Sequence, residues 1–148
     1  MNRLRNLAHR IGHRGATLIL LSLLDVAIGS GLFTIKDLGP AVRQNYAGQE
    51  ALMPLAFWAY LWFAAAAVLL ISAFRKRDGA AFLVGTFIKV LWAIAFLESW
   101  FLGAPRAWIS ACTWFAIAAW LGIVSGWKEN AAVRPMVVRT SPRVTYDD

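Results

Sequence analysis

The sequence predicts an all-α fold, an integral membrane bundle of four helices with a short amphipathic helix before it and a polar tail after it. Hydrophobic residues make up 59% of the 148 residues and charged residues only 16%, against about 25% charged residues in soluble domains. The hydrophobic residues lie in four blocks of about 20 residues, the length that a helix needs to cross a bilayer. Lysine and arginine are concentrated in alternate connections between these blocks.

Residues 1–15 predict a basic amphipathic helix on the cytoplasmic surface of the membrane. Apolar side chains recur there at helical spacing, and arginines occupy other positions around the same turns, where they would face anionic head groups. His9 and His13 are four residues apart, but without a third ligand nearby they predict no metal site. A secretory signal would also begin with a basic segment. Asp25 interrupts the apolar run that follows, and no small-residue cleavage site comes after it, so an uncleaved first helix is favoured.

The transmembrane domain is predicted over residues 16–127. Its spans are expected at residues 16–35, 52–74, 80–102 and 107–127. Residues 36–51 predict a polar connection with turns at Gly39-Pro40 and at Gly48. Residues 75–79 predict a tight basic turn. The tail, residues 128–148, is polar and interrupted by proline, which predicts poor order.

The distribution of cations predicts the orientation of the spans, because short basic connections stay on the cytoplasmic side. Eleven of the fifteen lysines and arginines fall in the amino-terminal segment, the 75–79 turn and the tail. Three fall on the opposite side: Lys36, Arg43 and Arg106. Trp100, Trp108 and Trp127 fall near span ends, where aromatic rings prefer the interface. The sequence therefore predicts a multi-pass protein of the cell inner membrane with both termini in the cytoplasm.

Two ionisable residues are predicted to meet inside the membrane. Asp25 and Lys89 each follow the inner start of their span by nine residues, so both would lie about 14 Å from the inner edge. Because charged side chains in spans face the protein interior or water, we expect an ion pair between spans one and three. The pair either fixes helix packing, which we favour, or belongs to a proton or ion pathway. A third alternative is that the two residues do not meet.

Small and hydroxyl-bearing residues surround both positions at helical spacing. Small residues would let spans one and three approach, and hydroxyls would complete the hydrogen bonding of the pair. These supporting residues are Ser22 and Gly29 beside Asp25, and Gly85, Thr86 and Ala93 beside Lys89.

Glu98 lies about half a revolution around the helix from Lys89 and near the outer interface. Arg106 or Lys36 would be within reach of it. An ordinary interfacial carboxylate is the favoured interpretation, and a lateral contact with another protein is the second.

Span four carries three small residues at a spacing of four, Ala118, Gly122 and Gly126. This spacing permits close helix contact, either within the bundle or between copies of the chain.

No motif predicts an enzyme, a cofactor or a metal. The sequence has no Walker loop, HExxH, CxxC or GxSxG motif, and Cys112 is the only cysteine. The net charge of +7 is divided among short segments rather than gathered on one face, so nucleic acid is not an expected partner. The expected partners are the bilayer, anionic head groups at its cytoplasmic face, and a second copy of the chain or another membrane protein.

The layout resembles that of small multi-span proteins of actinobacteria and their phages, including the holins of phage lysis cassettes. The resembling features are the basic start MNRLRNLAHR, short turns between hydrophobic spans and a charged tail. This resemblance covers the whole chain and includes no diagnostic motif. It implies a protein that oligomerises in the inner membrane and opens lesions there.

A second resemblance is to the small multidrug-resistance transporters, which also have four spans and an acidic residue in the first. It implies proton-coupled transport through Asp25, but Lys89 departs from that pattern because it would neutralise the carboxylate. A membrane scaffold or interaction subunit is the third class, and we rank it first, the holin-like class second and the transporter third.

Overall fold

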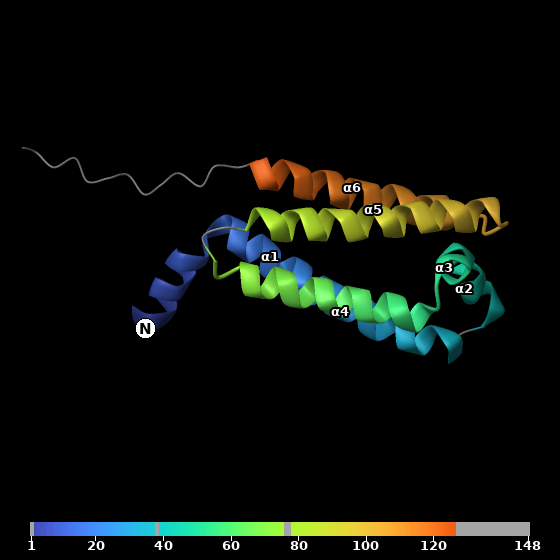
Figure 1. Cartoon of the computed structure of the whole chain (residues 1–148), viewed down its shortest axis with the longest axis horizontal. Coiled ribbons are helices and arrows are strands. Elements are labelled where there is room, and N and C mark those ends of the chain that lie inside the picture. Colours follow the sequence, from blue (N-terminus) through green and yellow to red (C-terminus); the bar gives the residue numbers. More distant parts are fainter. Residues whose placement is uncertain (1, 38, 76–77, 127–148) are drawn as a thin grey trace, which may run out of the picture.

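The computed structural model describes residues 2–37, 39–75 and 78–126, which form helices and turns with no strand among them. The predicted tail, residues 128–148, lies outside this range, as do the side chains of residues 2–11 on which the amphipathic face depends. The elements are α1 (Asn2–Thr34), η1 (Ile35–Asp37), α2 (Pro40–Gln44), α3 (Ala47–Leu52), α4 (Leu55–Ser72), α5 (Gly79–Phe101) and α6 (Ala107–Gly126) (Figure 1).

Four of these helices are long and apolar enough to cross a bilayer. They cover Gly12–Thr34, Leu55–Ser72, Gly79–Phe101 and Ala107–Gly126, and each falls on one predicted span. Only 28–50% of the residues in their most apolar stretches are buried inside the molecule. Large side chains such as Leu83 and Phe87 therefore point outward, 72% and 62% exposed. Soluble proteins rarely expose apolar surface on this scale, so the fold indicates a multi-pass membrane protein.

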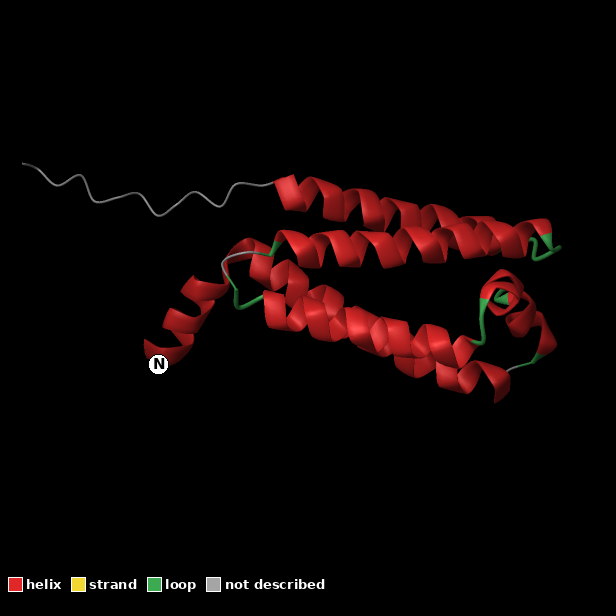
Figure 2. Cartoon of the chain, in the orientation of Figure 1, coloured by secondary structure: helices red, strands yellow, loops and turns green. Residues whose placement is uncertain are grey.

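The four long helices form two antiparallel pairs. The helix α1 packs along α4, and α5 packs along α6, while α4 contacts α5 between the two pairs (Figures 1 and 2). The packing order is therefore α1, α4, α5, α6. The spanning part of α1 begins, and α6 ends, at the same end of the bundle (Figure 1).

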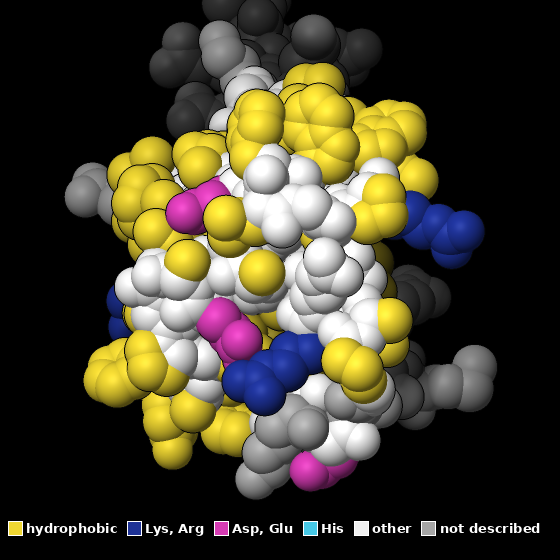
Figure 3. Space-filling view, turned by 90° about the vertical axis from the view of Figure 1, so that its right-hand side faces the viewer, with side chains coloured by type: hydrophobic (Ala, Val, Ile, Leu, Met, Phe, Trp, Pro, Cys, Tyr) yellow, Lys and Arg dark blue, Asp and Glu magenta, His cyan; other side chains and the backbone are white. Residues whose placement is uncertain are grey.

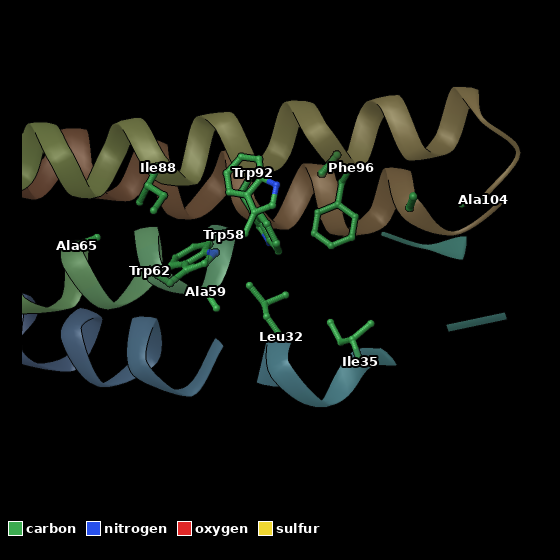
Figure 4. Close-up of a cluster of buried hydrophobic side chains, with 12 residues drawn as sticks. Leu32, Ile35, Trp58, Ala59, Trp62, Ala65, Ile88, Trp92, Phe96 and Ala104 are labelled. Carbon is green, nitrogen blue, oxygen red and sulfur yellow. The ribbon is translucent and has the colours of Figure 1, made fainter. Parts of the chain in front are cut away.

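Two hydrophobic clusters fill the interior. Near the end where α6 finishes, a largely aliphatic cluster draws on all four long helices, with Leu21, Leu69, Phe82 and Leu121 among its members. Toward α3, an aromatic cluster includes four large rings (Figure 4). Those rings belong to Trp58, Trp62, Trp92 and Phe96.

The connection between the first two spans is helical rather than a simple polar loop. The helix α3 lies between the two helix pairs and contacts α5 and α4 (Figure 1). Gly48 and Gln49 of α3 are buried. A Cβ at Gly48 would collide with the Ala95 carbonyl oxygen and lie 2.7 Å from Ser99 N. The prediction of a turn at Gly48 is wrong, because this glycine permits close helix contact.

The helix α1 bends at Gly12, where φ is 58° and ψ is 179°. Only glycine adopts this left-handed backbone region without steric cost. The residues before Gly12 turn away from the bundle (Figure 1). The apolar helix long enough to cross a bilayer runs from Gly12 to Thr34 and therefore includes Arg14.

A buried ion pair as the candidate functional site

The structure brings Asp25 and Lys89 together in the middle of the bundle. Lys89 Nζ donates to Asp25 Oδ1 at 2.5 Å, and both side chains are completely buried. Along α1, Asp25 lies between Leu21 of the aliphatic cluster and Leu32 of the aromatic cluster. The pair therefore occupies the junction of the two clusters, enclosed by apolar side chains on both sides.

A third residue, Trp62 of α4, completes the site. Lys89 Nζ lies 4.8 Å from the centre of the Trp62 ring. A desolvated cation over an indole face is stabilised by about 2 kcal/mol. The sequence predicts Trp62 only as a deep ring that packs against other helices or lipid, although it stands ten residues into the second predicted span and thus near the same depth as Lys89. The ring centres of Trp92 and Trp114 lie 5.5 and 5.4 Å from that of Trp62 and fix its position.

Some polar atoms of the core have no hydrogen-bond partner among the described residues. They include Asp25 Oδ2 and Trp62 Nε1, both buried. A buried group without a partner costs about 1–3 kcal/mol. The carboxylate of Asp25 thus uses one oxygen for Lys89 and has a second oxygen able to accept a proton or a hydrogen bond.

The small residues near the pair permit contacts with α4, not the predicted contact between α1 and α5. A Cβ at Gly29 would lie 3.2 Å from the Ala59 carbonyl oxygen, so Gly29 allows α1 to approach α4. A Cβ at Gly85 would lie 3.2 Å from Leu69 Cδ2, again on α4. The expectation that they bring α1 close to α5 is wrong. The long lysine stem spans the distance between those helices, so close approach is not required.

The hydroxyl groups do not complete the site either. Ser22 is buried and Thr86 is half-buried, but neither is hydrogen-bonded to the pair in the described part of the chain. The ammonium group instead contacts Asp25 and the Trp62 ring. Ala93, the remaining predicted neighbour, is fully buried on α5.

Glu98 lies at the contact between α5 and α3. Its Cβ would be 3.0 Å from a Cβ placed at Gly48, and its side chain is half-buried. Within the described side chains Glu98 forms no ion pair, so Arg106 is not its partner, and the side chain of Lys36 lies outside the described set. The helix α3, which forms where a polar loop was predicted, occupies the space beside it.

The small-residue stripe of span four is only partly packed. Ala118 is buried, whereas Gly122 and Gly126 are exposed and a Cβ at either would meet nothing within 4 Å. Packing of the whole stripe within the bundle is therefore contradicted. The buried face of α6 shares only Ala118 with this stripe and consists of Ala107, Ala111, Ala118, Leu121 and Val124.

A second ion pair lies at the end of the bundle opposite α3. Arg14 contacts both carboxylate oxygens of Asp78, with Nη2–Oδ1 at 2.7 Å and Nε–Oδ2 at 3.0 Å. The guanidinium also lies 5.0 Å from the centre of the Phe82 ring. Arg14 was expected to face lipid head groups, but it binds the residue that precedes α5. The sequence feature that could have indicated this ion pair was Asp78, the one acidic residue of the basic 75–79 turn.

The described residues contain no group of three or more His, Cys, Asp or Glu side chains that could hold a metal ion. No family model matches the chain, and neither a curated protein nor a solved structure is significantly similar to it. Function is therefore argued from the site itself, a sealed ion pair inside a four-helix membrane bundle.

Proposed function

We propose that the chain is a non-enzymatic scaffold or interaction subunit of the cell inner membrane, with four spans and both termini in the cytoplasm. The observation that carries this proposal is the Asp25–Lys89 pair, whose side chains are both completely buried. The pair joins the α1–α4 hairpin to the α5–α6 hairpin. A scaffold needs a fixed arrangement of spans, and a buried pair favours one arrangement, because separating two charges in hydrocarbon is costly.

The closed surroundings of the pair favour a structural role over ion exchange. A transport site must exchange its ion or proton with solution, whereas this site lies between two hydrophobic clusters. Leu21 and Leu69 belong to the cluster on one side, and Trp58 and Trp92 to the cluster on the other.

The proposed topology is supported by the uneven distribution of cations between alternate connections. A reporter enzyme that is active only in the periplasm tests it. Fused after Asp148, the reporter should be inactive, and fused into the α5–α6 turn at Gly103 it should be active. The reverse pattern would refute the topology and leave the ion pair untouched.

Expression of the full chain tests the scaffold role against the other two classes. We expect normal growth, an intact membrane and no resistance to cationic compounds. We also expect a stoichiometric membrane partner after cross-linking in intact cells. An Asp25→Leu/Lys89→Met double variant, which removes the charges and keeps the bulk, should retain that partner. Loss of the partner only when the charges are removed would show that they do more than fix packing.

One observation favours a second candidate, a small proton-coupled transporter. Asp25 Oδ2 is buried without a hydrogen-bond partner among the described residues, so the carboxylate can bind a proton. Lys89 would have to withdraw during the cycle. This candidate predicts uptake or resistance that disappears in Asp25→Asn. Abrupt growth arrest with release of a cytoplasmic marker would instead identify the lesion-forming activity that the holin-like layout implies.

A further inference from the structure

We propose that a cavity between α1 and α6 binds one acyl chain of a bilayer phospholipid, with the phosphate of that lipid near Arg106. The cavity has a volume of about 400 Å³ and lies in the half of the bundle that contains α3. Its inner wall is formed by Leu32 of α1 and by Trp92 and Phe96 of α5, all buried. Figure 4 shows the Leu32 side chain directed toward these two rings.

The cavity opens sideways, because α1 and α6 stand first and last in the packing order. Near the opposite end of the bundle, Leu18 and Leu121 belong to one cluster and close the space between these helices. In the half that contains α3, the cavity is lined instead by partly or largely exposed residues of the two helices, Gly31, Thr34 and Ser110. The opening therefore faces the hydrocarbon that surrounds the bundle.

The lining favours hydrocarbon over water. A buried water needs about two to four polar partners. The Thr34 hydroxyl already donates to the Gly31 carbonyl oxygen at 2.8 Å. The other side-chain hydroxyls of the lining belong to Tyr46 and Ser110, and the inner wall is aromatic and aliphatic. An empty cavity would deprive Trp92 and Phe96 of dispersion contacts. The bilayer supplies acyl chains next to the opening at very high local concentration, so a chain fills the space.

The size and the charge of the site identify the occupant. A volume of about 400 Å³ lies at the small end of the range of about 300–1,000 Å³ for ligand sites and suits a single hydrocarbon chain. Arg106 is exposed and precedes Ser110 by four residues, which places it about one helical turn closer to the end of the bundle. A cation at this level complements the phosphate of a lipid whose chain enters below it.

This inference uses the membrane assignment but neither the scaffold role nor a particular topology. It concerns whichever leaflet surrounds the α3 end of the bundle, which is the outer leaflet in the topology proposed above. The fusions at Asp148 and Gly103 test that topology separately, so either proposal can fail without the other.

Photolabelling of the full chain in vesicles tests the cavity. The vesicles contain phosphatidylethanolamine and phosphatidylglycerol, with a trace of phosphatidylglycerol that carries a diazirine midway along one chain. Labelled peptides are located by mass spectrometry. We expect labelling to concentrate on residues 28–35 and 110–114.

Gly31 lines the cavity and a Cβ there meets nothing within 4 Å, so Gly31→Leu adds an apolar side chain at the wall of the cavity. It should lower labelling of these two segments about tenfold. Ser110→Leu, from the other wall, should do the same. The matched control is Gly122→Leu, also into open space but away from the cavity, which should leave labelling unchanged.

Uniform labelling of all exposed helix faces in the wild-type chain would overturn the proposal, since it would show ordinary annular lipid only. Equal labelling of wild type, Gly31→Leu and Ser110→Leu would overturn it as well. Arg106→Gln should lower labelling of the two segments severalfold, and unchanged labelling in this variant would refute the assignment of the phosphate to Arg106.

Discussion

Lys89 and Asp25 connect α5 to α1, two helices that stand on either side of α4 and share little other contact. The connection passes over the face of Trp62, which α4 contributes. Three helices are thus joined at one point by a carboxylate, an ammonium group and an indole ring. The two helix pairs would otherwise be held mainly by the contacts of α5 with α4 and α3.

Removing one partner of this pair should destabilise the bundle more than removing both. Asp25→Asn or Lys89→Met leaves an unpaired buried charge, which costs about 3–5 kcal/mol, whereas the Asp25→Leu/Lys89→Met double variant should be nearly neutral. Thermal unfolding in mild detergent measures the difference. The exchanged pair, Asp25→Lys with Lys89→Asp, should be more stable than either single reversal. If exchange restores nothing, direct pairing is refuted.

Trp62 should be replaceable by phenylalanine but not by leucine. Trp62→Phe keeps a ring face under Lys89 and removes the buried Nε1 that has no partner among the described residues, so stability should change little. Trp62→Leu removes the cation–π contact and the aromatic packing and should cost at least about 2 kcal/mol. The comparison uses the same unfolding assay. Equal losses in both variants would show that only the volume of the side chain matters.

Gly48→Ala should separate α3 from α5. The added Cβ collides with the backbone of Ala95 and Ser99, and overpacking of this kind costs about 1–3 kcal/mol. The matched control is Gly39→Ala, where a Cβ meets nothing within 4 Å and φ is −60°. Protease sensitivity of the connection should rise in the first variant only. A resistant Gly48→Ala protein would contradict the observed position of α3.

The Arg14–Asp78 pair should contribute measurable stability, whereas the Arg43–Glu50 pair should not. The first pair is less than a fifth exposed, with side chains 18% and 17% accessible, and the second is 58% and 33% accessible. Arg14→Gln should therefore cost about 1 kcal/mol, including its contact with Phe82, and Arg43→Gln close to zero. Unfolding curves at low and high salt check this. A loss on Arg14→Gln no larger than that on Arg43→Gln would refute it.

Stability should fall at alkaline pH through Tyr46, which lies between α2 and α3. Burial raises the pKa of the Tyr46 hydroxyl above its ordinary value of 10.0, because the ionised form is poorly solvated there. The unfolded chain therefore releases the proton first, and stability is lost as the pH rises from the ordinary pKa through the raised one. Tyr46→Phe should remove this part of the alkaline decline. Identical stability–pH profiles of the wild-type and Tyr46→Phe proteins would exclude a contribution of Tyr46 to the alkaline decline.

Several features follow from the sequence because they depend on hydrophobicity and length alone. Four blocks of apolar residues predict four spanning helices, since a backbone in hydrocarbon must satisfy its own hydrogen bonds. The equal depth of Asp25 and Lys89 follows from helix rise, which is the same in every span. The helix α3 was not predicted, because its residues are polar enough for a loop and glycine at position 48 is typical of a turn.

The sequence by itself thus determined the class of the protein, the number of spans and the depth of the charged residues along each helix axis. The tertiary structure alone decided what surrounds each side chain around that axis. Helix rise gives no information about which helices become neighbours, so these relationships exist only once the helices are packed. They are the contact of Trp62 with Lys89, the contact of Gly29 with α4, the ion pair of Arg14 with Asp78, and the cavity between α1 and α6.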